Sequence, residues 1–550
     1  NEKYAAGPWR SLDTGFRGEY WSKAIWLFHD SPTLTEAFLQ KYYDSMILQA
    51  EHIMECHSAY RYMSNWGVIE NHGLFEIGVC LPQSEKTKQF IAFAVKNLEV
   101  QVRMQIMPDG VHWEQSPMYH NEVLHCLLDV ILLAKRNDIA LPDVILRQTE
   151  KMAMADVAWL KPDHHIVMMG DSDDVDVRDR ISVAAYLFLN PVLRFGGFDR
   201  LDYESIWDLG MKAGEEYAGM ERREPDFTSL FLEHSGNTYF RSDWSERANF
   251  LHLHSGTMGA GHGHSDKLHI DLVVNGEDVL MDGGRYTYVS GPKRFSYKDP
   301  SGHNTITVDD LPFTVCKDSW ECSKLSQPVK ENFRCMELAE FAQAGQLGYM
   351  DLPGGVYVNR KVVYIKPDLY VLADEMYTGD RHTYQQYFHF NNHGTVTQNA
   401  PGEKKFPCVA YRGKMAEADF YFVSAQVKAE LKSGHIARHY NVEEENTVCK
   451  VTKQGEGFTS LITVIDAQPG RPLSIEKLPV RSALKQTDYP ETMAEALKIT
   501  AGEKEYVVIL CHQEVNSPTD LVEVDGCMGY GNVIVFDKAG DVLVGDVLNW

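Results

Sequence analysis

The chain has 550 residues, of which 44% are hydrophobic and 24% are charged, and its formal net charge is −25. This composition is that of a globular protein, and it excludes a disordered, a collagen-like and a coiled-coil chain. At roughly 150 residues per domain, the length corresponds to three or four domain-sized units. The excess of acidic residues argues against polyanion binding through bulk charge, so no nucleic-acid partner is predicted.

No apolar run reaches the roughly 18 residues that a membrane-spanning helix needs. The best candidate, residues 123–134, is interrupted by His125 and Asp129, so no membrane insertion is predicted. The chain opens with Asn1 rather than Met, which is typical of a processed or trimmed chain whose upstream residues are missing. The ten cysteines contain no CxxC pair, and their number does not decide the redox compartment.

The first 220 or so residues have the periodicity of helices. Apolar residues recur at three- and four-residue spacing in 34–56, 87–105 and 117–136. Ser116-Pro117 is a typical helix start, and Asp109-Gly110 marks a turn before it. Repeated helix–loop–helix units predict stacked antiparallel helix pairs, as in a bundle, a solenoid or a toroid.

Short alternating segments replace the helices after about residue 225. Leu268, Ile270 and Leu272 share one face of a predicted strand, and Asn275-Gly276 predicts a hairpin turn. Similar segments recur at 357–365, 369–373, 384–390, 419–423, 458–465, 505–511 and 532–536. We therefore predict a helical domain over 1–225 and a domain of antiparallel sheets, packed as a β-sandwich, over 226–550.

Histidines are concentrated at the start of the predicted sheet domain. In an extended Gly261–Asp266 segment, His262, His264 and Asp266 would line one face. Asp282 follows just past the hairpin, and His303 follows again in Gly302-His303-Asn304. A set of His and Asp from neighbouring strands suits Zn²⁺ or another borderline divalent ion.

Two other interpretations of these histidines remain open. The first is a set of ordinary surface and core histidines with no ligand. The second is the HxHxDH signature of metallo-β-lactamase-type hydrolases, although Lys267 stands in place of its last His and the helical first half does not fit that fold.

A second group of polar residues lies in the helical half. It comprises the pair Asn71-His72 and the segment Glu114–His120, which contains Gln115 and Tyr119 at a helix start. Helix starts present side chains and free N–H groups to anions. Taken alone, Asn71-His72 is equally explained as a cap or an internal hydrogen bond, and Tyr119 as a core aromatic residue.

Together these motifs resemble the heparinase II/III-like polysaccharide lyases. They occur in that family's order from residue 9 to about residue 310. The motifs are Trp9–Arg17, Asn71-His72, Glu114–His120, Gly170–Asp173, His262–Asp266, Asp282–Gly284 and His303–Thr305. The resemblance implies an α+β multidomain fold, with an incomplete N-terminal (α/α) toroid followed by an antiparallel β-sheet domain and an active site in the cleft between them. A helical part of about 220 residues is short for such a toroid.

The reaction that the resemblance implies is β-elimination on a uronic-acid polysaccharide. Asn71 would hydrogen-bond the uronate carboxylate, with Gln115 or a protonated Glu76 assisting, and would stabilise the enolate-like intermediate. Tyr119 would be the general acid, and the base for one C5 configuration. His72 or His262 would be the base for the other configuration.

The resemblance also implies the ligands of one divalent metal ion, namely His264, Asp282 and His303. Zn²⁺ is expected there, with Mn²⁺ or Ca²⁺ as alternatives, in a structural rather than a water-activating role. Arginines that pair with carboxylate or sulfate and aromatic faces that cover sugar rings give the predicted substrate contacts. These are Arg10, Arg17, Trp66, Trp113, Gln115, Tyr288 and Arg294.

We therefore predict a lyase acting on glycosaminoglycans of the heparan sulfate, chondroitin sulfate and hyaluronan class. An alginate or oligoalginate lyase of the same fold is the first alternative. A metal-dependent hydrolase and a non-catalytic carbohydrate-binding protein are alternatives of other classes. The partner would be an anionic uronate polysaccharide or oligosaccharide, and the location the periplasm or the cell exterior. The oligomeric state is not predicted.

Overall fold

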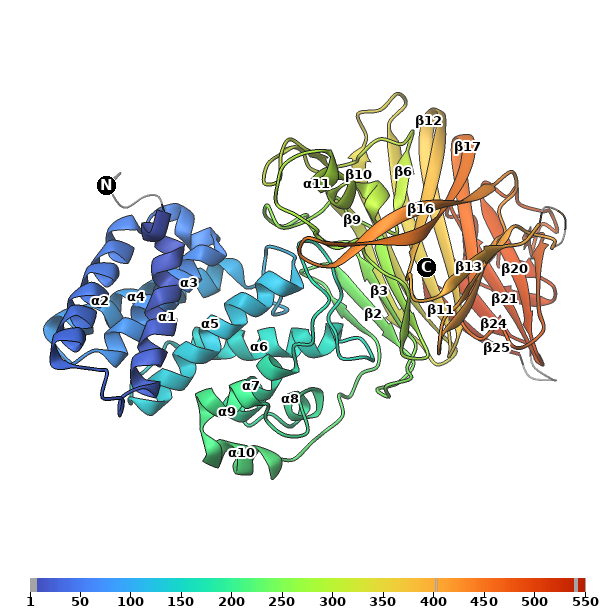
Figure 1. Cartoon of the computed structure of the whole chain (residues 1–550). Helices are drawn as coiled ribbons and strands as arrows, with labels where there is room; N and C mark the ends of the chain where they lie inside the picture. Colours follow the sequence, from blue (N-terminus) through green and yellow to red (C-terminus); the bar gives the residue numbers. More distant parts are fainter. Residues whose placement is uncertain (1–6, 401, 403, 539–542, 550) are drawn as a thin grey trace. The chain divides into compact units, whose positions relative to one another are not determined.

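A computed structural model of the chain describes residues 7–400, 402, 404–538 and 543–549 (Figure 1). The chain divides into two compact units. The helical unit comprises Asn1–Trp159 and Val175–Pro225, and the β unit comprises Leu160–Asp174 and Asp226–Trp550. The sequence analysis placed 160–174 in the helical domain, whereas the contacts of this segment group it with the β unit. The segment belongs to the β unit, where its side chains pair with residues of the sheets.

The helical unit consists of helices joined by short loops, as the periodicity predicted. Its helices are α1 (Ser11–Leu27), α2 (Glu36–Cys56), α3 (Asn65–Cys80), α4 (Glu85–Gln105), α5 (Pro117–Arg136), α6 (Asp143–Trp159), α7 (Arg178–Phe188), α8 (Pro191–Gly196), α9 (Tyr203–Leu209) and α10 (Met211–Ala218), with short 3-10 turns η2 (Gly7–Trp9) and η3 (Ala59–Met63). Polar caps start several of them. Thr35 accepts a hydrogen bond from the Phe38 N–H at the start of α2, and Ser84 and Thr87 form a capping box at the start of α4.

Helix α3 is the centre of the helical unit. It is buried from Asn65 to Gly78 except at Trp66, because α1, α4 and α5 all pack against it. Helices α1 and α3 meet backbone to backbone at glycines: a Cβ on Gly18 would lie 2.5 Å from the carbonyl oxygen of Gly73. Only residues without a side chain allow this approach.

The helices α1, α3 and α5 run parallel, so their N-terminal ends lie together. The Arg10 guanidinium, at the start of α1, lies 5.4 Å from the Trp66 ring at the start of α3. Asn65, also at the start of α3, hydrogen-bonds Glu114, which lies just before α5. At the other end of the same helices, Lys23 of α1 pairs with Asp129 of α5.

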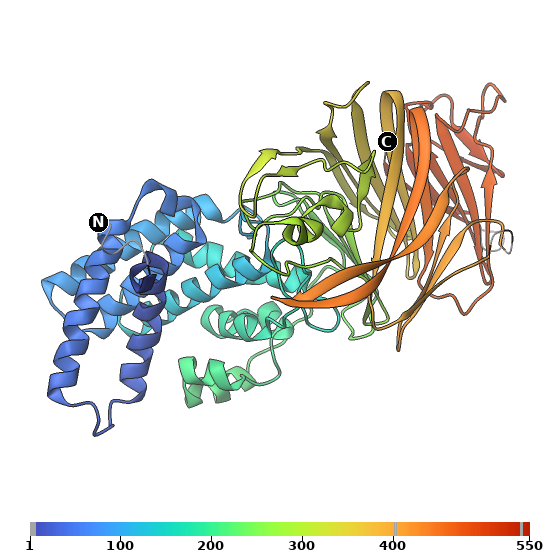
Figure 2. The same ribbon diagram turned by 45° about the horizontal axis from the view of Figure 1, so that its top comes forward.

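The β unit is built around one large antiparallel sheet. The strand order along the sheet is β1-β2-β3-β4-β5-β12-β17-β15-β14-β13, with β6, β9, β10, β11 and β16 paired alongside. A five-stranded sheet, β18-β20-β21-β24-β25, a three-stranded sheet, β19-β22-β23, and the hairpin β7-β8 complete the unit (Figures 1 and 2).

The elements of this unit are β1 (Leu230–Leu232), β2 (Asn237–Arg241), β3 (Phe250–His254), β4 (His269–Val274), β5 (Glu277–Leu280), α11 (Pro292–Lys298), η4 (Pro300–Gly302), β6 (Ile306–Val308), β7 (Val315–Cys316), β8 (Cys322–Lys324), β9 (Pro328–Cys335), β10 (Ala339–Tyr349), β11 (Val356–Ile365), β12 (Leu369–Phe390), β13 (Thr395–Gln398), β14 (Cys408–Arg412), β15 (Glu417–Phe422), β16 (Lys428–His439), β17 (Val442–Asp466), β18 (Leu473–Leu478), β19 (Arg481–Ser482), β20 (Ala494–Ala501), β21 (Lys504–Cys511), β22 (Val522–Val524), β23 (Cys527–Gly529), β24 (Val533–Asp537) and β25 (Val544–Asn549).

Alternating residues of β12 are buried in two different cores. Tyr370 and Leu372 pack in one core with residues of β3, β4 and β15. Val371 and Ala373 pack on the other face, against residues of the five-stranded sheet such as Leu497. The second core lies between two packed sheets, so the predicted antiparallel β-sandwich is confirmed.

The first strands of the β unit position the histidines. Strands β3 and β4 pair with His254 opposite His269, and the predicted turn Asn275-Gly276 joins β4 to β5. Asp282 follows β5, and His303 comes just before β6, which pairs with β12. Across the described part of the chain, none of the helices has the length and apolar character needed to cross a bilayer.

Candidate active site

A single carboxylate organises the histidines of the β unit. Asp171 comes from the segment 160–174, and its side chain is fully buried. Its Oδ2 accepts hydrogen bonds from His262 Nδ1 at 3.0 Å and from the Arg294 guanidinium at 2.8 Å. Its Oδ1 lies 2.9 Å from His264 Nε2. Asp171 therefore fixes the orientation of two predicted site histidines at once.

The contact with Asp171 defines the chemistry of the His262 ring. When Nδ1 donates to the carboxylate, the basic nitrogen of the ring is Nε2. This carboxylate–imidazole arrangement is the one that orients general bases in hydrolytic triads. The His262 side chain is 11% exposed, whereas that of His264 is fully buried. His262 is thus the histidine of this group with access to a ligand.

Aromatic rings surround His262. Trp320 meets its ring edge to face with the centroids 5.3 Å apart, and the Tyr288 ring lies 6.0 Å away. Trp320 is half-exposed, and Tyr288 is partly exposed. Aromatic faces of this kind cover sugar rings, and the substrate contact of Tyr288 stays a prediction.

The three predicted metal ligands lie together. One ligand atom each of His264, Asp282 and His303 falls within 4.8 Å of the others, and all three residues are buried. His264 Nδ1 and His303 Nε2 make no hydrogen bond within the described residues. Two buried ring nitrogens without a hydrogen bond beside a carboxylate suit a borderline divalent ion such as Zn²⁺.

The protonation states in this group also suit a metal. Burial lowers the pKa of His264 to about 3, so its ring is neutral, as a metal ligand must be. Burial alone would raise the pKa of Asp171, but the hydrogen bonds from His262 and His264 outweigh it and hold that pKa well below the usual range. Asp171 is therefore a carboxylate at neutral pH.

Arg294 does not have the position predicted for a substrate-binding arginine. Its side chain is fully buried, and its guanidinium pairs with the Asp171 carboxylate and donates to the Arg285 carbonyl. Because this cation is already neutralised and closed to solvent, the predicted substrate contact of Arg294 is at odds with the structure. Its place in the fold is to hold Asp171.

A second polar group lies at the start of α3 in the helical unit. The Asn65 Nδ2 donates to both oxygens of Glu114, at 3.1 and 2.8 Å. Gln105 Nε2 donates to the Ser64 carbonyl, and Gln105 Oε1 lies 2.9 Å from His112 Nε2. The two contacts with Glu114 fix the position of the Asn65 amide.

Backbone strain occurs at the same place. Gln115 has a φ of 51°, in the left-handed region that residues with a side chain rarely adopt. Such strain persists only where surrounding contacts impose it, and it is concentrated at functional sites. The predicted site residue Gln115 is buried there, between Glu114 and the start of α5.

The remaining predicted residues of this end are partly accessible. Tyr119, in the first turn of α5, and Trp113 are both partly exposed. Trp66 is partly exposed and lies between the guanidinium groups of Arg10 and Arg61, at 5.4 and 5.0 Å. The structure therefore brings Arg10, Trp66 and Gln115 to the N-terminal ends of α1, α3 and α5.

Asn71 is not placed for the role predicted from the resemblance. Its side chain is fully buried, and its Nδ2 donates to the Gly67 carbonyl within α3 and to Gln101 of α4. The amide takes part in helix packing. The direct contact with a uronate carboxylate predicted for Asn71 is therefore at odds with the structure.

His72 is also not placed as a base. It lies roughly 10 Å along α3 from Asn65, at 1.5 Å per residue, and only 1% of it is exposed. Burial alone would lower its pKa, but Cys126, Asp129 and Glu76 around the ring outweigh burial and hold it well above the usual range. A protonated, buried ring cannot remove a proton from a substrate.

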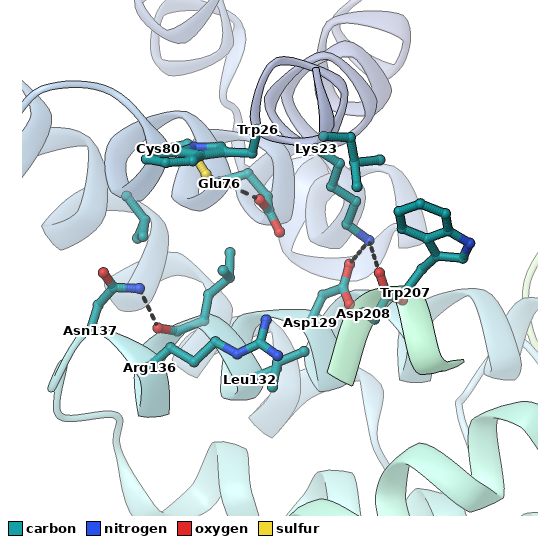
Figure 3. A pocket seen from close by; sticks show the side chains of 13 residues that line it. Lys23, Trp26, Glu76, Cys80, Asp129, Leu132, Arg136, Asn137, Trp207 and Asp208 are labelled. Atoms are coloured by element: carbon teal, nitrogen blue, oxygen red, sulfur yellow. Dashed lines mark hydrogen bonds and ion pairs between the residues drawn. The ribbon is translucent and has the colours of Figure 1, made fainter. Parts of the chain in front are cut away.

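A pocket of about 330 Å³ opens beyond His72, at the C-terminal ends of α3 and α5. Figure 3 shows Lys23 reaching down to Asp129 and Asp208, with Glu76 nearby and Trp26 and Trp207 at the sides. The Lys23 ammonium lies 2.6 Å from Asp129 and 3.5 Å from Asp208. His72 lies 3.5 Å from Glu76 and 3.4 Å from Asp129, so Glu76 is part of an internal ion-pair network.

The sequence analysis missed three residues of the candidate site. One feature of the sequence could have indicated Asn65. It follows Ser64 at a helix start, a position from which side chains can face a ligand. Asp171 lies in the Gly170–Asp173 motif, which was recognised without a role. Trp320 has no signal of its own, since only the folded hairpin β7-β8 brings it to His262.

Comparisons with known proteins agree with this architecture. Residues 1–191 match the heparinase II/III N-terminal domain, and residues 225–471 match the heparinase II/III-like C-terminal domain. A heparin-sulfate lyase of Pedobacter heparinus is 25% identical over 341 residues, which cover 58% of this chain and 47% of that protein. A heparin-sulfate lyase of Bacteroides thetaiotaomicron is 22% identical over 402 residues, 68% of this chain and 53% of the relative. The chain thus spans about half the length of the curated relatives that it matches.

Solved structures show the same fold. A mutant of the heparan sulfate lyase HepC from Pedobacter heparinus superposes with a TM-score of 0.72 at 20% identity, over 92% of this chain and 75% of that one. A chondroitin AC lyase of Streptomyces coelicolor superposes with a TM-score of 0.51 at 11% identity, over 96% and 79%. With both domain families matched in order, the chain belongs to the heparinase II/III-like family.

Proposed function

We propose that the protein is a polysaccharide lyase that cleaves glycosaminoglycans of the heparan sulfate class by β-elimination. The observation that carries the proposal is the partly exposed His262, oriented by the buried Asp171 carboxylate and next to the His264–Asp282–His303 group. The matched relatives that are named heparin-sulfate lyases support the choice of substrate.

The proposed reaction removes a proton from C5 of a uronate and breaks the bond from C4 to the glycosidic oxygen. The electron pair of the C–H bond forms a double bond between C4 and C5, and the leaving oxygen takes up a proton. His262 Nε2 is the proposed base, since Asp171 stabilises the imidazolium that forms. Positioned proton transfers of this kind contribute about 10²–10⁴-fold to a rate.

The leaving oxygen needs an acid. The resemblance implies this role for Tyr119, together with that of base for the other C5 configuration, and both remain predictions. Tyr119 is partly exposed in the first turn of α5, where helix N–H groups favour developing negative charge.

We propose that Asn65, rather than Asn71, donates to the uronate carboxylate. The Asn65 amide is held by Glu114 at the first turn of α3, whereas the Asn71 amide is turned into the packing. A fixed amide donor stabilises the negative charge that moves onto the carboxylate as the proton leaves.

We further propose one Zn²⁺ held by His264, Asp282 and His303. A bound ion would supply positive charge that ties three loops of the β unit together. Removing it with EDTA should lower both the melting temperature and the turnover, and adding Zn²⁺ back should restore both. Loss of turnover at an unchanged melting temperature would contradict a structural role.

Heparan sulfate is a large extracellular polymer, and on this ground we propose that the protein works in the periplasm or outside the cell. Arg10 is a cation of the helical unit that could meet carboxylate or sulfate, because its side chain is 49% exposed. Its guanidinium also pairs with Asp13.

The test is ultraviolet absorbance during incubation with heparan sulfate, chondroitin sulfate, hyaluronan and alginate in separate cuvettes. The unsaturated product absorbs, so we expect a rise with heparan sulfate and none for the Tyr119→Phe variant. A rise with alginate alone would replace the proposed substrate. New reducing ends without any rise in absorbance would indicate hydrolysis and would refute the lyase proposal.

A further inference from the structure

Two cysteines face each other across the short hairpin of β7 and β8. Cys316 and Cys322 are opposed residues of the antiparallel pair, and their Sγ atoms lie 3.4 Å apart. Of the ten cysteines, this is the one pair in sulfur–sulfur contact within the part of the chain that the structure describes. We propose that the pair is a redox-active dithiol, which closes to a disulfide on reaction with a small disulfide such as oxidised glutathione.

The backbone geometry suits such a bond. Directly opposed residues of an antiparallel pair have Cα atoms about 4.5–5.5 Å apart, within the roughly 4.4–6.8 Å that a disulfide spans. The turn between the strands is already ordered, because Asp318 Oδ1 accepts hydrogen bonds from the N–H groups of Trp320 and Glu321. An ordered turn therefore holds the two cysteines opposite each other.

The two thiols differ in reactivity. The hydrogen bond between the two sulfur atoms and the nearby Lys298 ammonium lower the pKa of Cys322 to about 7. The same hydrogen bond and burial raise the pKa of Cys316. Both residues are partly exposed. Cys322 is thus a thiolate nucleophile within reach of a small reagent, and Cys316 is the partner that resolves the mixed disulfide.

The proposed chemistry balances with the oxidant named. The Cys322 thiolate attacks one sulfur of oxidised glutathione, so that the S–S bond breaks and one glutathione thiolate leaves. The Cys316 thiol then gives up its proton and attacks the Cys322 sulfur, which releases the second glutathione. Two protein thiols lose two electrons and two protons, and the oxidant becomes two glutathione thiols.

The hairpin is attached to the candidate active site. Trp320 lies in the turn between the two cysteines and packs its ring against His262 at 5.3 Å. Lys298 Nζ donates to the carbonyls of Gly261, next to His262, and of Ser319 in the turn. A disulfide would therefore hold Trp320 at His262. This consequence, unlike the dithiol itself, rests on the proposed function.

The dithiol is tested by incubating the whole chain with oxidised glutathione and mapping its peptides by mass spectrometry. We expect a linked Cys316–Cys322 peptide and the loss of two hydrogen atoms from the protein. Cys316→Ser should instead carry one glutathione on Cys322, because nothing resolves the mixed disulfide. Cys322→Ser should leave Cys316 unmodified. Cys335→Ser, which removes an exposed cysteine on β9, is the matched control and should still form the linked peptide.

Two outcomes would overturn the proposal. One is glutathione on Cys322 of the unmodified chain without the linked peptide. The other is equal glutathionylation of Cys322 in Cys316→Ser and of Cys316 in Cys322→Ser. This result would contradict the assignment of Cys322 as the attacking thiol.

The link to the site is tested by comparing oxidised and reduced protein in the absorbance assay. A Trp320 side chain that is already held in place loses less conformational entropy when the substrate binds. The KM for heparan sulfate should therefore fall roughly fivefold at an unchanged kcat. Dithiothreitol should reverse the effect, and Cys322→Ser should not show it. An equal KM for both forms would refute the link. Absence of product from either form would refute the proposed function and leave the linked peptide as evidence for the dithiol.

Discussion

The carboxylate of Asp171 is shared by His262, His264 and the Arg294 guanidinium. Asp171→Asn keeps the shape of the side chain but removes the charge and one acceptor, so His262 is no longer held in the tautomer with a basic Nε2. We expect kcat/KM to fall about 10²–10⁴-fold, as for the loss of an orienting carboxylate in a triad.

The matched control for that variant is Asp174→Asn. Asp174 lies three residues away and pairs with Lys161 and His165 rather than with His262. The Asp174→Asn variant should have a lower free energy of unfolding without a comparable loss of kcat/KM. If both variants lost activity equally, the effect would come from the segment 160–174 as a whole and not from the Asp171–His262 contact.

His72 provides a second test at the scale of residues. The ring is buried between Glu76 and Asp129, at 3.5 and 3.4 Å. His72→Gln removes a buried cation and leaves carboxylates unpaired, which typically costs about 3–5 kcal/mol. We expect a lower melting temperature and a retained kcat at a temperature where the variant is folded. A folded variant without activity would restore the catalytic role first predicted for His72.

The site residues show what a sequence can and cannot indicate. His262 and His264 are two positions apart, and a metal-ligand pattern is visible in the chain itself. Asn65 and Asn71 both lie buried in α3 beside polar neighbours, and only their hydrogen-bond partners in the fold distinguish them. The pairing of Asp171 with His262 spans 91 positions, and no local pattern encodes such a contact.

At the scale of elements, the contact of α1 with α3 depends on glycine. A Cβ on Gly73 would lie 2.1 Å from the Gly15 carbonyl oxygen, far inside van der Waals contact. Gly73→Ala must push the two helices apart, and overpacking of this kind costs about 1–3 kcal/mol. Urea unfolding should show this loss of stability.

The control for this variant is Gly214→Ala in the exposed helix α10. A Cβ there would meet only the Ile206 side chain, at 3.9 Å. Because alanine favours a helix over glycine, we expect an increase in stability of about 0.5–1 kcal/mol. Equal losses in both variants would show that the close contact between α1 and α3 is not the cause.

Helices and strands with a regular spacing of apolar residues could be predicted from the sequence. Strands whose length depends on pairing with a distant segment could not. The helix predicted over 117–136 is α5, Pro117–Arg136. The segments 369–373 and 384–390 were predicted as separate strands. They form the single strand β12, Leu369–Phe390, since β17 pairs along almost all of it and absorbs the irregularity as a bulge.

For the whole molecule, stability depends on pH through groups such as His120. Burial lowers the pKa of His120 to about 3. Its Nδ1 accepts from the His112 N–H, and its Nε2 faces the Met152 carbonyl, so the neutral ring satisfies both contacts. The unfolded ring, with a pKa near ~6.5, binds a proton first. The contribution of the neutral His120 ring to the free energy of unfolding is therefore complete above about pH 6.5. It is lost as the pH falls toward 3.

His120→Gln isolates this contribution. The stability difference between the unmodified chain and the variant should shrink by about 2 kcal/mol between pH 7.5 and pH 5. Urea unfolding at both pH values measures it. A difference that stayed constant with pH would show that His120 is not kept neutral by the fold.

The pairing of β12 with β17 also sets an order of events during synthesis. Leu369 pairs with Asp466, so one edge of β12 has no partner until nearly a hundred further residues have left the ribosome. The contacts of the helical unit are more local, and local contacts form sooner. The helices can thus fold while translation continues, whereas the large sheet must wait for β17, which ends at Asp466. In that interval the nascent chain exposes an unpaired strand edge, and there a chaperone would do most to prevent aggregation.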